Sequence, residues 1–215
     1  MLLSRATTAQ PEPRTTKHTK IYRGHERHIV TIQDFSWPSW LIRKTMNVLI
    51  PADDIQRRVR EIADEIHRDH AGGVHLIAVL KGAFIFLSDL ARAMPGPCSI
   101  DFMAVSSYGK GSTSSGQVQL LKDLGTGIEG QDVVIVEDIV DTGLTLTYLQ
   151  DILHARSPRS LRTACLLSKP SRRLVQVKVD YIGFEIEDKF VVGYGLDYAE
   201  QHRNLPHIAV MNEPV

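Results

Sequence analysis

The stretch 133-VVIVEDIVDTGLTL-146 decides how the rest of the chain is interpreted. Its first residues, 133–136, are apolar without polar alternation, which is typical of a strand buried on both faces of a sheet. Glu137 and Asp138 follow at the carboxyl end of this run, and Asp141 opens a turn rich in hydroxyl groups. In sheets of parallel strands, ligands bind at the carboxyl ends of the strands. The stretch therefore predicts a buried strand that ends at a ligand site.

The turn after this strand, Thr142-Gly143-Leu144-Thr145, has the composition of an anion-binding turn. A helix is expected to follow it, and the first amides of a helix favour a phosphate group. The threonines add hydroxyl donors, and the glycine lets the backbone approach a ligand closely. Because carboxylates repel phosphate, the neighbouring acids indicate a ligand that also carries hydroxyl groups, such as a ribose phosphate. The alternative is a cluster of helix-capping acids without a ligand.

Strand and helix patterns alternate along most of the chain. The segments predicted as strands are 75–80, 98–105, 132–137, 161–168, 175–186, 190–194 and 207–211. Helical spacing of apolar residues predicts helices between Asp53 and Gly72, between Phe84 and Pro95, and over 145–155. The alternation favours an α/β fold, in which a mostly parallel sheet is flanked by helices.

The sequence also predicts the cap of the first helix and the inward face of the second. We expect Asp53 or Asp54 to cap the first helix, since short acids accept hydrogen bonds from the first amides. In the second helix we expect Phe84, Leu87 and Leu90 to point inward, because they recur near the helical period.

Composition limits the class of protein. The chain has 215 residues, of which 25 are basic, 25 acidic and 43% hydrophobic. This balance is that of an ordinary globular protein and gives no basic surface for nucleic acid. The longest apolar region, 74–94, is interrupted by Lys81 and Asp89, and no secretory signal is evident, so we expect no membrane association. Cys98 and Cys165 fit no disulfide framework, which favours a cytoplasmic protein.

Residues 1–45 differ in character from the rest. The segment 6–20 is rich in Thr, Pro and charge, so we expect a flexible N-terminal extension. The globular pattern starts at Met46, and one domain is expected to span 46–215. Either translation begins at Met46 or the extension is a true arm, and the sequence leaves both open.

Two other patterns are weaker candidates. Residues 125–130, Gly-Thr-Gly-Ile-Glu-Gly, match the dinucleotide fingerprint, but they precede a strand instead of following one. His67 and His70 could suggest a metal pair, but no third ligand lies at a useful spacing. We interpret the first pattern as a turn and the histidines as exposed helix residues.

Taken with its surroundings, the opening stretch resembles the phosphoribosyl-diphosphate motif of type I phosphoribosyltransferases. From about Val48 to the C-terminus the chain resembles the hypoxanthine-guanine phosphoribosyltransferases. The matching segments are 79–91, 106–109, 133–146, 166–170 and 188–205. Leu144 departs from the pattern, since many relatives carry a polar or basic residue there. The resemblance implies the type I fold with a small hood lobe, formed near 46–54 and 170–215, that carries the purine site.

This resemblance implies an enzyme of purine salvage. It would transfer the phosphoribosyl group from 5-phosphoribosyl diphosphate to N9 of hypoxanthine or guanine, with Mg²⁺, giving IMP or GMP and pyrophosphate. The turn from Asp141 to Thr145 would hold the 5′-phosphate, and Glu137 and Asp138 would bind the ribose hydroxyls, directly or through the metal. Asp141 would act as general base or acid at N7 of the purine. Asp197 would be a second contact for Mg²⁺.

The other residues that the resemblance implies surround this turn. They are Lys81, Gly82 and Arg203 for pyrophosphate; Lys169, Phe190, Val191 and Asp197 for the purine; and Ser107 and Tyr108 for the catalytic lid. Lys169 would donate to O6 of the base, Phe190 would stack on its ring, and Val191 would pair through its backbone. The Ser/Gly-rich stretch 106–117 is too small and polar to pack, which predicts a mobile loop that could close over the reaction.

Other functions stay open from the sequence. A phosphoribosyltransferase for xanthine or for a pyrimidine is the nearest alternative, although Lys169 and 190–198 disfavour a pyrimidine. A regulator that senses phosphoribosyl diphosphate and binds nucleic acid would need a basic module, which the balanced charge does not supply. An inactive scaffold would not need the acids together with Lys81 and Lys169. The resemblance also implies a homodimer or homotetramer.

Overall fold

The structure is a computed structural model that describes residues 19–23, 26–30, 46–107 and 118–211. The chain divides into two units, 1–44 and 45–215. In the first unit, β1 (Thr19–Arg23) pairs antiparallel with β2 (Glu26–Val30), a hairpin that the sequence analysis did not anticipate. The flexible character of residues 1–45 stays a prediction.

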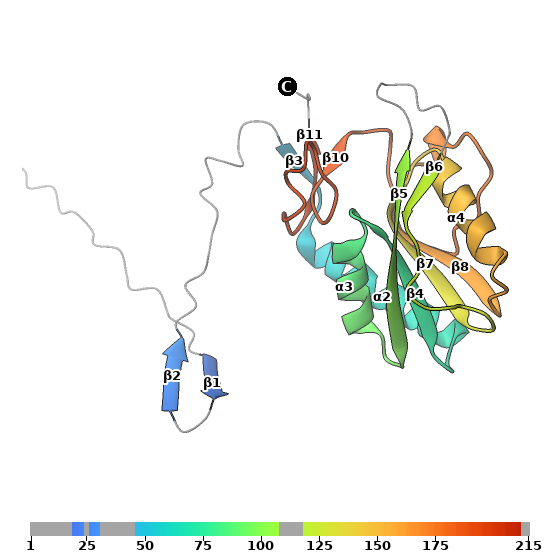
Figure 1. Cartoon of the computed structure of the whole chain (residues 1–215). Helices are drawn as coiled ribbons and strands as arrows, with labels where there is room; N and C mark the ends of the chain where they lie inside the picture. The colour runs from blue at the N-terminus through green and yellow to red at the C-terminus, as the bar shows by residue number, and fades with distance from the viewer. Residues whose placement is uncertain (1–18, 24–25, 31–45, 108–117, 212–215) are drawn as a thin grey trace, which may run out of the picture. The chain divides into compact units, whose positions relative to one another are not determined.

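A six-stranded sheet forms the centre of the second unit, in the order β6-β5-β4-β7-β8-β9 (Figure 1). Its strands are β4 (Val74–Leu80), β5 (Cys98–Ser107), β6 (Val118–Lys122), β7 (Asp132–Val140), β8 (Ser160–Ser168) and β9 (Tyr181–Glu185). All neighbours are parallel except β6, which runs antiparallel to β5. The α/β class predicted from the sequence is confirmed.

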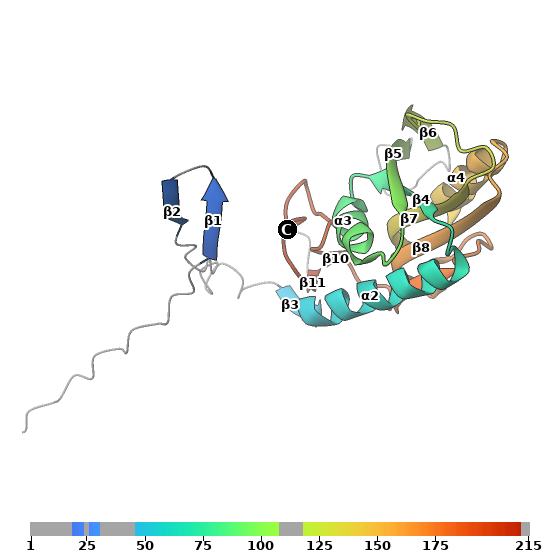
Figure 2. The same cartoon turned by 90° about the horizontal axis from the view of Figure 1, so that it is seen from below.

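Helices cover both faces of this sheet. Figures 1 and 2 show α2 (Ala52–Asp69) and α3 (Phe84–Ala93) on one face and α4 (Leu144–His154) on the other. Side chains of β7 alternate between the two cores: Val134 packs with α2 and α3, whereas Ile135 packs with α4. The apolar run 133–136 is thus buried on both sides, as its composition predicts.

Three expectations about the helices are wrong in detail. α2 begins at Ala52, and Asp53 and Asp54 lie in its first turn without capping it. Their negative charges there still interact favourably with the partial positive charge at the N-terminus of the helix. Phe84 is 43% exposed, and Phe86 is buried in its place, because the inward stripe of α3 runs through Phe86 instead. His70 is buried at the C-terminus of α2 and not exposed.

Strand boundaries also differ from the sequence-based expectations. Ser106 and Ser107 belong to β5, while 108–117 lies outside the described residues. Of the predicted strand 175–186, only Tyr181–Glu185 joins the sheet. At the start of the predicted strand, the N–H of Val175 lies 3.5 Å from the carbonyl oxygen of Thr142 in the β7–α4 turn, which also accepts a hydrogen bond from the N–H of Leu174 (3.0 Å).

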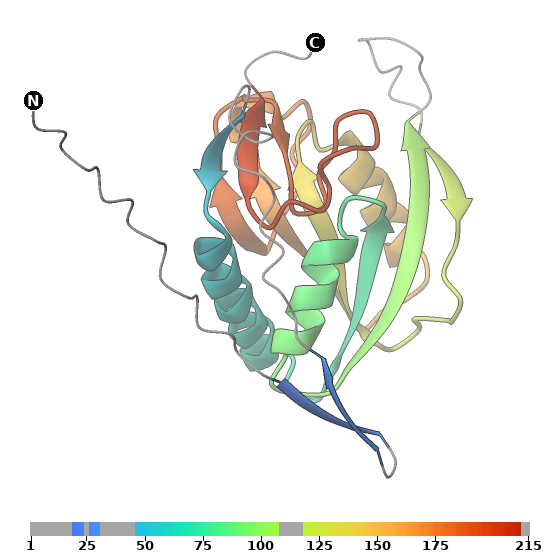
Figure 3. The same cartoon turned by 90° about the vertical axis from the view of Figure 1, so that its left-hand side faces the viewer.

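A second, three-stranded sheet forms the small lobe. Its antiparallel order is β10 (Val191–Val192), β11 (Ile208–Met211) and β3 (Met46–Ile50). Figure 3 shows these strands side by side at the start of α2. In the described part of the chain no helix is long and apolar enough to cross a membrane.

Asp89 of α3 ties the small lobe to the main core. Its Oδ2 accepts hydrogen bonds from Oη of Tyr194 and Nε2 of Gln56, both at 2.6 Å. Burial alone would raise the pKa of Asp89, but these hydrogen bonds and Arg92 hold it below its ordinary value. A single carboxylate therefore joins α2, α3 and the segment that follows β10.

Tyr194→Phe removes one of these donors and keeps the ring. We expect a loss of about 2 kcal/mol in the free energy of unfolding, because a hydrogen bond to a buried charge is lost. Urea denaturation measures it. Tyr148→Phe on α4, where the hydroxyl makes no hydrogen bond within the described residues, is the matched control. If the two variants are equally stable, the hydrogen bond from Tyr194 to Asp89 does not contribute to the stability of the fold.

Candidate active site

The acids of the opening stretch lie where the parallel strands end. Glu137 and Asp138 are near the end of β7, which runs to Val140. A cavity of about 210 Å³ lies there, lined by Val79, Glu137, Asp138, Ile139, Val140, Asp141, Thr142, Gly143, Thr145 and Leu146. Gly143 has φ +87° at the start of α4, a left-handed conformation that favours glycine. The sequence-predicted turn and acids are thus brought together.

Neither acid at the end of β7 is neutralised by a cation in direct contact. Burial raises the pKa of Glu137 well above its usual value, and the charge of Asp138 adds to this. Burial also raises the pKa of Asp138, to about 6, against the opposing effect of the Ile139 N–H (2.8 Å). The Glu137 carboxylate accepts no hydrogen bond from the described residues, although its backbone takes part in the β7–β8 ladder. Both carboxylates are therefore placed to accept hydrogen bonds from a ligand or to bind a cation.

Glycines allow three backbone segments to meet beside Asp138. A Cβ at Gly82, in the β4–α3 turn, would collide with the Asp138 carboxylate. A Cβ at Gly195 would collide with the carbonyl oxygen of Gly82. The peptide bond between Leu80 and Lys81 is cis. The β4–α3 turn, the end of β7 and the segment after β10 therefore form one wall of the site.

Cations and acids form a network along this wall. Nζ of Lys81 lies 3.0 Å from Oε2 of Glu200. Arg203 pairs with Asp197 (2.7 Å) and donates to the carbonyl of Gly195 (2.8 Å). The Nε of Arg203 is buried without a partner within the described residues. Two of the residues predicted to bind pyrophosphate, Lys81 and Arg203, thus share the neighbour Glu200.

A second charged group lies on the other side of the turn. Lys169, directly after β8, is 8% exposed, and its Nζ lies 3.5 Å from Asp188. Nε of Arg172 lies 3.2 Å from Oδ1 of Asp141, and its NH1 lies 3.6 Å from Asp188. Asp188 therefore connects the ammonium of Lys169, through Arg172, to Asp141.

Phe190 lies at the surface of the small lobe. It is 46% exposed, so it is not a core aromatic, and it meets Tyr198 edge to face at 5.7 Å between ring centroids. Val191 is buried beside it in β10. Of the predicted lid, Ser107 ends β5 and Tyr108 lies outside the described residues.

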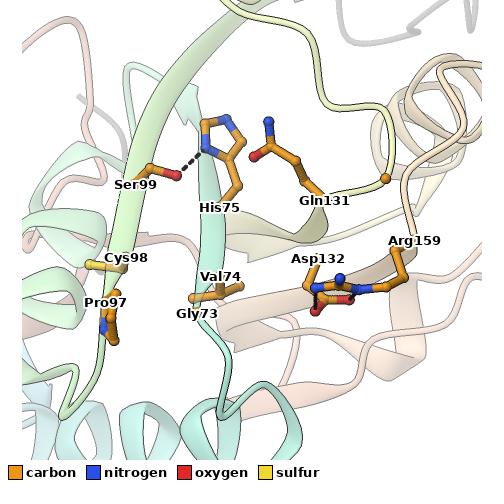
Figure 4. Close-up of a pocket in the computed structure, with 10 residues that line it drawn as sticks. Gly73, Val74, His75, Pro97, Cys98, Ser99, Gln131, Asp132 and Arg159 are labelled. Atoms are coloured by element: carbon orange, nitrogen blue, oxygen red, sulfur yellow. Dashed lines mark hydrogen bonds and ion pairs between the residues drawn. The ribbon is translucent and has the colours of Figure 1, made fainter.

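A larger cavity, of about 410 Å³, lies at the opposite ends of the strands, where β4, β5 and β7 begin (Figure 4). Two pairs of its polar groups satisfy each other: Asp132 pairs with Arg159, and Nδ1 of His75 lies 2.7 Å from Oγ of Ser99, while Nε2 of His75 has no partner within the described residues. Chemistry favours the smaller cavity, which gathers two acids without a cation in direct contact and the turn that opens α4.

Comparison with known proteins finds relatives over most of the second unit. A family model described as the phosphoribosyl transferase domain matches residues 51–199. The hypoxanthine-guanine phosphoribosyltransferase of Bacillus subtilis is 47% identical over 78% of this chain and 94% of its own length; that of Mycobacterium avium is 51% identical over 79% and 87%. The crystal structure of the Bacillus anthracis enzyme, with HEPES in its active site, superposes with a TM-score of 0.75 at 45% identity, covering 78% of this chain and 99% of that one.

The chain belongs to the hypoxanthine-guanine phosphoribosyltransferase family. It is therefore an enzyme of the pentosyl-transferring class, with the type I phosphoribosyltransferase fold.

Within this phosphoribosyltransferase, sequence reasoning missed Arg173. Its guanidinium donates to the carbonyls of Val140 and Asp141 and to Oγ of Ser168 (3.0 Å). It thereby fastens the turn after β7 to the end of β8. Arg172 was missed too; the only signal in the sequence was a pair of arginines shortly after a strand that ends at the site.

Asp138→Asn tests the electrostatic state of this site. Since the folded pKa of about 6 lies above the ordinary value of 3.8, ionisation of Asp138 destabilises the native state by an amount that grows as pH rises from 3.8 to about 6 and is constant above that. At pH 7.5, with a chelator present to remove metal ions, we expect the free energy of unfolding of the variant to exceed that of wild type by about 1–3 kcal/mol.

The gain should shrink as pH falls from 7.5 to 5, because wild type then becomes protonated as well. Urea titrations at both pH values measure it, with Asp151→Asn, an exposed acid of α4, as control. A gain that does not depend on pH would contradict this account.

Proposed function

We propose that the chain transfers the phosphoribosyl group of 5-phosphoribosyl diphosphate to N9 of hypoxanthine or guanine, in a Mg²⁺-dependent reaction of purine salvage. The products are IMP or GMP and pyrophosphate. The observation that carries the proposal is a pair of acids without a cationic partner in direct contact, the buried Glu137 and the half-buried Asp138, beside the turn at the start of α4. A ligand with both ribose hydroxyls and phosphate suits that pair and that turn.

The ribose 5-phosphate half of the substrate binds at the β7–α4 turn. Backbone amides and hydroxyls of Thr142, Gly143, Leu144 and Thr145 hold the phosphate, because the start of a helix carries partial positive charge. Leu144 takes part through its amide, so its apolar side chain does not matter for this contact. Glu137 and Asp138 accept the ribose hydroxyls.

Magnesium fits the donors of this site only together with substrate oxygens. Among the described residues, no three His, Cys, Asp or Glu side chains group closely enough to hold a metal ion. Glu137, Asp138 and Asp197 offer the hard oxygens that Mg²⁺ prefers, while phosphate oxygens and water would complete its shell. When bound, the ion neutralises charge on the diphosphate.

The diphosphate and the lid complete the substrate pocket. Lys81, the backbone at Gly82, and Arg203 bind the departing pyrophosphate, supported by the unpartnered buried Nε of Arg203. Ser107 and Tyr108 begin the lid, which excludes water while positive charge develops on the ribose ring.

The purine lies between the small lobe and the end of β8. Lys169 donates to O6 of the base, and its burial makes a mismatched amino group costly at that position. Phe190 stacks on the ring, which suits its exposure, and Val191 pairs with the base edge through its backbone. Asp197 lies on the same lobe.

Asp141 handles the proton at N7. As N9 forms its bond to the ribose, the carboxylate takes the N7 proton, and it returns the proton in the reverse direction. Its contact with Arg172 keeps it at the edge of the turn in the free protein. We further propose a cytoplasmic homodimer or homotetramer.

Assays with separate bases test the function. The full chain is mixed with Mg²⁺, phosphoribosyl diphosphate and either hypoxanthine, guanine, xanthine, adenine or uracil, and nucleotide formation is followed by absorbance. We expect turnover of hypoxanthine or guanine and none of adenine or uracil. Binding of phosphoribosyl diphosphate without turnover of any base would favour a regulator instead.

Asp141→Asn tests the proton-transfer role. We expect kcat to fall by about 10²-fold or more, with little change in KM for phosphoribosyl diphosphate, because a general base is lost and the phosphate contacts remain. Steady-state kinetics with hypoxanthine measure both constants, and Asp151→Asn on α4 is the control. Unchanged turnover would remove Asp141 from the proton transfer.

A further inference from the structure

A carboxylate of the chain itself pairs with the two cationic side chains that are proposed to bind pyrophosphate. One oxygen of Glu200, Oε2, lies 3.0 Å from Nζ of Lys81 and 3.6 Å from NH2 of Arg203. A diphosphate oxygen bound by the same two cations would need the same place. We propose that Glu200 stands in for the diphosphate in the free enzyme and so lowers the affinity of the site for phosphoribosyl diphosphate and pyrophosphate. This inference rests on the proposed function, which assigns Lys81 and Arg203 to pyrophosphate.

The contact with Lys81 is one that a substrate can displace. The side chains of Lys81 and Glu200 are 65% and 66% exposed, so water screens their attraction. The neighbouring ammonium of Lys81 lowers the pKa of Glu200, so the carboxylate is ionised at neutral pH. A diphosphate carries more charge than one carboxylate and can exchange with it.

Arg203 does not need Glu200 to hold its position. Its NH1 donates to the carbonyl of Gly195 (2.8 Å), and its NH2 lies 2.7 Å from Oδ1 of Asp197. The backbone N–H of Glu200 donates to the other oxygen of Asp197 (2.8 Å), a contact that does not involve the Glu200 side chain. Removing the carboxylate charge therefore removes a competitor and leaves the cation in place. Binding of the diphosphate should tighten.

Glu200→Gln tests the competition directly. Calorimetry of pyrophosphate binding to the full chain with Mg²⁺ should give a dissociation constant about two- to fivefold smaller than that of wild type, the range expected for an exposed ion pair. KM for phosphoribosyl diphosphate should fall by a similar factor. Unchanged or weaker binding of pyrophosphate overturns the inference.

Two further variants separate displacement from net charge. Glu200→Asp keeps the charge but is one methylene shorter, so it cannot lie between both cations, and we expect it to bind pyrophosphate more tightly than wild type as well. If Glu200→Asp binds pyrophosphate like wild type while Glu200→Gln binds it more tightly, the effect comes from net charge, and the proposal that the diphosphate displaces Glu200 is wrong. Glu61→Gln is the matched control, because Glu61 is an exposed acid near two cations of its own helix, Arg57 and Arg58.

The two proposals fail in different ways. Wild-type protein that forms no nucleotide and binds no pyrophosphate contradicts the proposed function itself. Wild-type protein that forms nucleotide, with all Glu200 variants binding pyrophosphate alike, contradicts only the competition by Glu200.

Discussion

The site depends on how closely three backbone segments approach one another. Gly82 lies against the carboxylate of Asp138, and Gly195 lies against the carbonyl of Gly82, and neither position has room for a Cβ. Because no side chain separates these segments, the acids of β7, Lys81 and the segment with Arg203 are held near one another. The geometry follows from packing that only glycine permits.

This packing has an electrostatic cost that the ligand offsets. Two adjacent carboxylates, the buried Glu137 and the half-buried Asp138, lie at the end of β7, and the pKa of each is raised in the free protein. A cation or hydroxyl donors would stabilise the ionised pair, so substrate binding and folding stability are coupled. The described residues thus hold an unfavourable electrostatic arrangement at the proposed active site.

Local chemistry explains what the sequence predicts well and what it does not. The run 133–136 and the turn after it were predictable, since burial on two faces and helix N-termini leave clear patterns. Phe84 was misassigned because a shift along a short helix changes the face. Arg173 and Glu200 act through contacts with residues distant in sequence, and no periodicity marks such contacts.

The small lobe joins both ends of the described domain. β3, at 46–50, pairs with β11, at 208–211, and β10 pairs with β11 as well. During synthesis the β7–α4 turn and its sheet can form while the chain is still emerging, but this lobe lacks its middle strand until Ile208–Met211 have left the ribosome. A nascent chain would therefore acquire the proposed phosphate site before the proposed purine site.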